Sequence, residues 1–269
     1  MLTGAAGVRG VLRPEGAAGR FTLARHDPEP GLAPFIDWFW IVHWDLRGQP
    51  SYEQSILPHP SVHLVFEADG PRVYGVDTKV FTRRLQDAGK VLGVRFRAGC
   101  FRPFCGAPVS SLTDTVVPAA THFGLQAEVA NEAIMNAASD EEMIAIAAAM
   151  LRATDPPRDP TAEMVAEMVG RITSDRELRR VGQLTAPFAM TERRLQRLFG
   201  EYVGVSPKWV MRRARLHEAA LRADSGAEID WAQLASDLGY ADQAHLTRDF
   251  TATLGVPPAR YASQSPPVT

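Results

Sequence analysis

The sequence has few cysteines, no long apolar run and no signal peptide. Only two of its 269 residues are cysteines, Cys100 and Cys105, which excludes a disulfide framework. Their spacing is not that of a zinc knuckle or a redox pair, so we expect reduced, mostly buried thiols. No apolar run approaches the ~20 residues of a membrane helix, and the N-terminus lacks the basic and apolar segments of a signal peptide. We therefore expect a cytoplasmic protein with no membrane contact.

Motifs of common catalytic sites are also missing. There is no phosphate-cradling glycine-rich loop, nucleophile elbow or H-E-x-x-H sequence. His43, His59 and His63 invite a metal interpretation because imidazole is the commonest zinc ligand. The sequence lacks, however, the H-x-H pair with a following Glu and His of metal-dependent cupins. We expect no enzyme, no metal and no cofactor. The alternative is a cupin-type metalloenzyme, or a protein that responds to alkylation or redox change through Cys100 or Cys105.

Charge of one sign is not in excess, because 29 Lys and Arg face 31 Asp and Glu. This balance by itself argues weakly against nucleic acid. The distribution is uneven, however. Basic residues gather between positions 176 and 215, where only Glu177, Glu192 and Glu201 oppose them. A local basic stretch can neutralise phosphates even when the whole chain is slightly acidic.

The first half of the chain reads as strands. Residues 1–20 show no clear period and are predicted to be a flexible arm. From residue 21, short apolar segments are separated by Gly and Pro. Trp38, Trp40 and Trp44 alternate with Phe39 and Ile41, the period of two expected for a strand. This pattern predicts an antiparallel β barrel or sandwich within a domain at residues 21–154.

Helical spacing replaces the strand pattern from about residue 119 to 153. Ser139 and Glu142 form a capping box ahead of one amphipathic segment. The pair of helices either packs on the barrel or mediates dimerisation, and both alternatives stay open. Three prolines within residues 155–160 then predict a linker, because proline continues neither a helix nor a central strand.

Residues 161–263 are predicted to be all-helical, with residues 264–269 as a tail. Thr191 is a suitable N-cap for a helix that places Leu195 and Phe199 on one apolar face. The opposite face offers Arg193, Gln196 and Arg197. Arg can bind guanine through two hydrogen bonds and Gln can do the same to adenine, so this face suits insertion into the major groove.

A second unit repeats this pattern. One helix stops at Gly239, and Asp242 is the expected N-cap of the next, in which Leu246 and Phe250 face the core. A long helix from Ser206 to about Ala223 connects the units. At 1.5 Å per residue it spans roughly 25 Å, an order of length that could hold two reading helices about one DNA turn, ~34 Å, apart.

The last hundred residues resemble the AraC/XylS family of transcription regulators. The matching segments are Ser206-Pro207-Lys208-Trp209, Leu234-Ala235-Ser236-Asp237-Leu238-Gly239-Tyr240 and Leu254-Gly255-Val256-Pro257-Pro258. In that family the third and sixth helices enter successive major grooves. The resemblance implies base-reading roles for Arg193, Gln196, Arg197, Gln243, His245, Thr247 and Arg248. Phosphate contacts are assigned to Thr191, Arg194, Lys208 and Arg212.

The N-terminal half resembles the sensor domain of one actinobacterial-style branch of AraC regulators. The matching segments are residues 44–48, 57–60, 93–96 and 101–104. The resemblance implies a cupin-like barrel that binds an effector or mediates dimerisation. We assign Trp38, Trp40, Trp44, His59 and His63 to an effector pocket, although the same aromatics could simply fill the core. A small, partly aromatic effector would suit such a pocket.

Together these patterns predict an α+β protein of two domains, with an antiparallel, cupin-like N-terminal barrel or sandwich and a C-terminal double helix-turn-helix. The expected function is sequence-specific transcription regulation, with a first domain that senses an effector or mediates dimerisation. The expected partners are double-stranded promoter DNA, a small effector, RNA polymerase if the protein is an activator, and a second copy in a homodimer.

Overall fold

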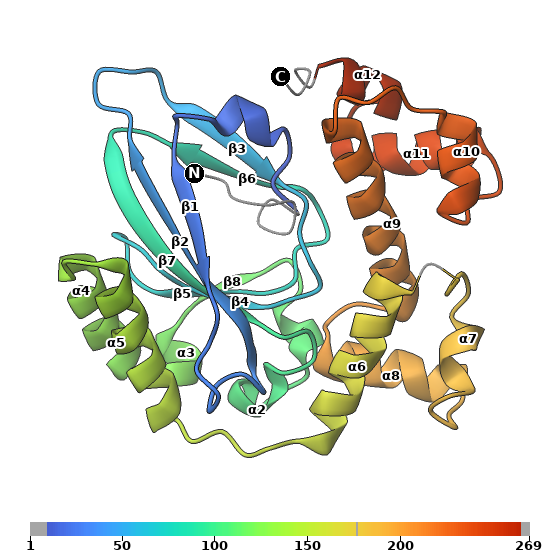
Figure 1. Ribbon diagram of the computed structural model, residues 1–269. Helices are drawn as coiled ribbons and strands as arrows, with labels where there is room; N and C mark the ends of the chain where they lie inside the picture. Colours follow the sequence, from blue (N-terminus) through green and yellow to red (C-terminus); the bar gives the residue numbers. More distant parts are fainter. Residues whose placement is uncertain (1–9, 176, 265–269) are drawn as a thin grey trace.

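The computed structural model describes residues 10–175 and 177–264 (Figure 1). Within them, eight strands precede most of the helices, which confirms the α+β organisation. The strands are β1 (Thr22–His26), β2 (Ile36–Asp45), β3 (Tyr52–Ile56), β4 (His63–Phe66), β5 (Arg72–Tyr74), β6 (Phe81–Leu85), β7 (Ala88–Phe96) and β8 (Val116–Pro118).

The strands form two antiparallel sheets. The larger sheet has the order β1-β2-β7-β4-β5-β8, and the smaller pairs β3 with β6. In β2 the predicted alternation decides which side chain faces which layer. Phe39 and Ile41 are buried in the main core, while Trp38 and Trp40 line the space between the two sheets. The larger sheet therefore has one apolar face covered by helices and one face turned toward the smaller sheet.

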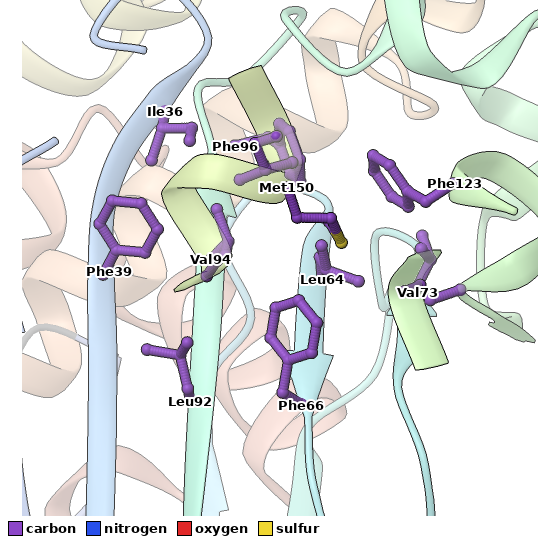
Figure 2. Packing of buried hydrophobic residues seen from close by; sticks show 14 of the residues in the cluster. Ile36, Phe39, Leu64, Phe66, Val73, Leu92, Val94, Phe96, Phe123 and Met150 are labelled. Carbon is purple, nitrogen blue, oxygen red and sulfur yellow. The ribbon is translucent and has the colours of Figure 1, made fainter. Parts of the chain in front are cut away.

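The helix-covered face carries the main hydrophobic core (Figure 2). Leu64, Leu92 and Val94 come from central strands and are fully buried. Helices α4 (Gln126–Asn136) and α5 (Asp140–Ala153) contribute residues such as Ile134 and Met150 to the same cluster. The helical pair therefore packs on the sheet, one of the two predicted alternatives. The outer side of α4 leaves Val129 69% exposed.

The remaining short elements of the first half are η1 (Pro14–Ala17), α2 (Arg102–Cys105), η2 (Val109–Leu112) and α3 (Ala120–Phe123). The C-terminal helices are α6 (Pro160–Ser174), α7 (Gly182–Thr185), α8 (Glu192–Tyr202), α9 (Pro207–Asp224), α10 (Trp231–Asp237), α11 (Gln243–Leu254) and α12 (Pro258–Ser263). None of the helices in the described ranges is long and apolar enough to cross a membrane.

The helix starts follow local sequence signals. A side-chain oxygen accepts a hydrogen bond from the first turn of each of the longer C-terminal helices, which satisfies a backbone amide that has no partner within the helix. These N-caps are Asp159 for α6, Thr191 for α8, Ser206 for α9, Asp230 for α10 and Asp242 for α11. One half of the predicted capping box forms, since the amide of Glu142 donates to the hydroxyl of Ser139, while the Glu142 carboxylate accepts from the amide of Ala138 in place of that of Ser139.

Helix α9 connects two helical units, with α6, α7 and α8 at one end and α10, α11 and α12 at the other (Figure 1). Each unit has its own hydrophobic cluster, and both clusters also include residues from the first half of the chain. Val76 belongs to the cluster around α6 and α8, and Leu12 and Leu57 belong to the cluster around α9 and α11. The helical segment therefore packs directly on the β domain.

The predicted flexible arm is wrong for residues 10–20. Val11 forms a β-bridge with Ile56, Leu12 is 8% exposed, and Ala17 is fully buried. The backbone amide of Arg13 donates to the hydroxyl of Tyr261 in α12 at 3.2 Å. This segment packs because its few apolar residues find partners far away in sequence. Residues 1–9 of the predicted arm and 265–269 of the predicted tail lie outside the described residues.

Candidate nucleic-acid interface and effector cavity

Helix α8 presents a polar face of the composition predicted from the sequence. Thr191 accepts a hydrogen bond from the amide of Arg194 at 3.3 Å and so starts the helix. Leu195 and Phe199 are fully buried and fix its orientation. The opposite face then turns outward, and Arg193, Arg194, Gln196 and Arg197 are all exposed. These four long polar side chains can reach a partner without any rearrangement of the core.

Helix α11 repeats this arrangement. Asp242 accepts from the amide of His245 at 2.7 Å, and Leu246 and Phe250 are fully buried. The preceding turn needs Gly239, whose φ of 72° lies in the left-handed region. The predicted reading residues Gln243, His245 and Arg248 are exposed, while Thr247 is half-buried.

Helix α9 separates the two polar faces. Its 18 residues span about 27 Å. Lys208 is exposed in its first turn, as a phosphate contact requires. Arg212 has a second role, because its guanidinium forms an ion pair with Asp249 of α11. Asp249 also accepts from the hydroxyl of Tyr240 at 2.9 Å. This network fixes the angle between α9 and the second candidate reading helix.

A cavity of about 220 Å³ lies between the two sheets. Trp38, Trp40, His59 and His63 line it, in agreement with their assignment to a pocket. Trp44 does not, and its assignment is wrong. Its ring lies against Gly89, and its Nε1 donates to the carbonyl of Gln86 at 2.9 Å. Trp44 sits near the end of β2, where the sheet extends past the cavity.

Two arginines that the sequence did not single out stack on Trp38. The guanidinium carbon of Arg25 lies 4.6 Å from the ring centroid, and that of Arg95 lies 4.1 Å from it. Both residues line the cavity. They come from β1 and β7, on either side of β2, and Arg95 is the register partner of Trp38. Only the strand order brings them together, so no local sequence signal could have revealed this cluster.

His63 lies beside the same cluster. Its Nδ1 accepts from Nε1 of Trp40 at 3.2 Å. Burial, together with the positive charges of Arg95 and Arg25, lowers the pKa of His63 to about 3. The imidazole is therefore neutral at physiological pH, as its acceptor role requires.

The cavity wall directly contacts helix α9. The ring of His59 stacks on His217 of α9, with centroids 4.2 Å apart and an interplanar angle of 12°. His217 is buried, and its Nε2 lies 3.2 Å from the carbonyl oxygen of Pro58, to which it donates when that nitrogen carries the proton. Nearby, Arg213 donates to the carbonyl of Thr78 at 2.6 Å. Pro58 and His59 thus belong both to the cavity and to the surface on which α9 rests.

The alternative chemistries find little support in the geometry. Burial raises the pKa of the Cys100 thiol to about 11 and also raises that of Cys105. A reactive thiolate needs a shift in the opposite direction. Within residues 10–175 and 177–264, no three His, Cys, Asp or Glu side chains are grouped to hold a metal ion. His43 instead pairs with Asp140 at 2.7 Å.

Comparison with known families gives two matches. Residues 184–264 match a helix-turn-helix domain, and residues 24–118 match a domain of unknown function, DUF6597. The first match covers α8, α9 and α11, the elements that carry both polar faces. The C-terminal part of the chain is therefore a helix-turn-helix domain. A comparison with curated proteins gives no match.

Among solved structures the chain is similar to ToxT from Vibrio cholerae. Wild-type ToxT bound to an unsaturated fatty acid is 10% identical, with a TM-score of 0.42, over 93% of this chain and 95% of ToxT. Another crystal structure of ToxT is 11% identical, with a TM-score of 0.40, over 91% of this chain and 97% of ToxT. A likeness at this level carries no information about what this chain binds.

Proposed function

We propose that this chain is an AraC-type DNA-binding transcription regulator in which α8 and α11 read successive major grooves of one operator. The observation that carries the proposal is the pair of exposed polar faces on two capped helices held apart by α9. Arg193, Gln196 and Arg197 read bases from α8. Gln243, His245, Thr247 and Arg248 read bases from α11, and Thr191, Arg194, Lys208 and Arg212 contact phosphate.

Two exposed faces with this composition favour reading over mere solvation. A surface helix needs polar side chains, but it does not need an exposed Arg at the same place after the N-cap of two helices, as Arg197 in α8 and Arg248 in α11 are. An α-helix fits the major groove, and a rod of about 27 Å sets two such helices roughly one DNA turn apart. The N-capped ends also point backbone amides and the positive helix dipole outward, which suits a neighbouring phosphate.

We further propose that the cavity binds a small effector and that its occupancy changes how the helical domain meets DNA. The support is the shared wall, since His59 lines the cavity and stacks on His217 of α9. Any ligand that moves His59 or the Pro58 backbone changes the surface on which α9 rests. Because α9 carries both units, a small shift there alters the distance and angle between the reading helices.

The remaining details stay predictions. Membership of the actinobacterial-style branch, a homodimer and contact with RNA polymerase come from the resemblance alone. The proposed binding to promoter DNA predicts a cytoplasmic location.

The reading role is tested by measuring the affinity of the full chain for two duplexes, one selected from sheared genomic DNA and one of random sequence. We expect Arg197→Ala to weaken the free energy of binding to the selected duplex by about 1–3 kcal/mol. The variant should also discriminate less between bases at one position of the site. Lys208→Ala should weaken binding to both duplexes alike. It should also reduce the slope of log affinity against log salt concentration by about one.

Arg222→Ala is the matched control, because Arg222 lies at the far end of α9 and pairs with Glu218 on its own helix. It should leave both affinities unchanged. If Arg197→Ala weakens binding to the selected and the random duplex equally, α8 does not read bases.

A further inference from the structure

The cavity has a strongly cationic end. Arg25 and Arg95 both place their guanidinium carbons within 5 Å of the Trp38 ring centroid. Bringing two positive charges onto one ring away from bulk water costs free energy, because the charges repel and lose hydration. Burial also lowers the pKa of Arg25. An anion bound at this end would offset both costs.

The side chains next to the two arginines lie in a fixed row across the sheet. Across the sheet, Trp38 pairs with Arg95 and Arg95 pairs with His63, so the three side chains form one row. Burial lowers the pKa of His63, and the positive charges of Arg95 and Arg25 act in the same direction. Ser61 accepts from Nε of Arg95 at 3.1 Å and holds its guanidinium in place.

The acidic residues near the cavity have cationic partners of their own. Glu67 is bound by Arg83 at 2.5 Å and by the hydroxyl of Tyr74 at 3.0 Å. Burial and the nearby Asp114 raise the pKa of Asp77, and the charge of Arg213 opposes this rise. Arg95 also contacts Asp37 at 3.3 Å, but Asp37 is outside the cavity lining. Glu67, which lines the cavity, is thus paired with cationic groups outside the Arg25 and Trp38 cluster.

The rest of the cavity is mainly apolar. Leu23, Val42 and Val91 line it from the larger sheet, and Ile56 and Phe81 line it from the smaller one. At the packing density of protein interiors, a ligand that fills 220 Å³ has a van der Waals volume of about 160 Å³. That is the size of a one-ring acid with a short chain or of a medium-chain alkyl acid.

We propose that the cavity binds a small organic carboxylate, with its charged group at Arg25 and Arg95 and its apolar body between the two sheets. This inference rests on the proposed effector function and specifies its ligand class. A planar carboxylate can accept paired hydrogen bonds from guanidinium groups, the geometry that arginine favours. An apolar body excludes water from the remaining wall.

The test compares acids with their neutral amides by calorimetry on the full chain. The probes are phenylpropanoate with phenylpropanamide and octanoate with octanamide, so that aromatic and alkyl bodies are distinguished. We expect the acid of at least one pair to bind about tenfold more tightly than its amide, because hydrogen bonds to a charged group are stronger than those to a neutral one. Arg25→Gln should abolish this preference, and Arg25→Lys should keep part of it.

Arg84→Gln is the control, because Arg84 is exposed on β6 outside the cavity lining and its loss changes net charge equally. It should leave the acid preference intact. Equal binding of acid and amide, or an acid preference that survives Arg25→Gln in a folded variant, overturns the carboxylate assignment while the cavity remains a ligand site. Binding of an acid without any change in DNA affinity instead contradicts the proposed sensing function.

Discussion

Gly93 shows how one missing side chain shapes the cavity. The indole of Trp40 lies across β7 where Gly93 has no side chain, and a Cβ there would lie 1.9 Å from Cε2 of Trp40. The indole can therefore lie flat on the sheet and donate to His63. A glycine in a strand weakens it in general, so its presence here serves the close approach of the ring.

We predict that Gly93→Ala destabilises the protein by about 1–3 kcal/mol, the usual cost of overpacking. Urea unfolding followed by tryptophan fluorescence measures this. Gly170→Ala is the opposite case, because a Cβ at Gly170 in α6 meets no atom within 4 Å. That change should stabilise the protein by about 0.5–1 kcal/mol. Equal effects at both sites would contradict the packing of Trp40.

His63 predicts a specific loss of stability in acid. Its folded pKa of about 3 lies below the unfolded value of 6.5. Between these values the unfolded chain binds more protons, so stability falls as pH drops from about 6.5 toward 3. His63→Gln should lose less stability between pH 7 and pH 5 than the wild type does, as measured by urea midpoints. A difference between the two proteins that does not vary with pH would contradict the shift.

At the scale of elements, local signals predicted the reading helices well. Thr191 and Asp242 were expected as N-caps, and both cap their helices. Ser206 followed by Pro207 marked the start of α9. Such signals act within one helical turn, so they can be read from neighbouring residues.

Thr191→Ala tests whether the cap positions the α8 face. It should cost about 1 kcal/mol of stability through loss of the cap, and it should weaken DNA binding as the first turn frays. Thr191→Ser keeps an acceptor oxygen and should restore both stability and affinity. Thermal unfolding and DNA titration measure the two effects. If Thr191→Ala leaves stability unchanged, the hydroxyl does not cap α8.

The cavity was less predictable because strand pairing is non-local. The alternation in β2 placed Trp38 and Trp40 on one face, as expected from a period of two. It could not show that Trp44 lies beyond the cavity, or that β1 and β7 bring Arg25 and Arg95 to Trp38. These positions depend on strand order and register, which no single segment encodes.

At the scale of the whole molecule, the β domain and the helical domain share packing. Leu12, from the predicted arm, and Leu57 lie in the cluster around α9 and α11. Arg102 of α2 also pairs with Glu201 of α8 at 2.8 Å, and Thr113 donates to the carbonyl of Gly204 at 2.7 Å. Contacts to both helical units mean that a change in the β domain reaches both reading helices.

The central claim is that α8 and α11 read two halves of one site, and selection of bound duplexes from a random library tests it most directly. For the wild type we predict one motif with two half-sites about one helical turn, roughly 10 base pairs, apart. Arg197→Ala should lose sequence preference in one half-site and Arg248→Ala in the other. A motif with a single half-site, or loss at the same base pairs in both variants, would contradict the account.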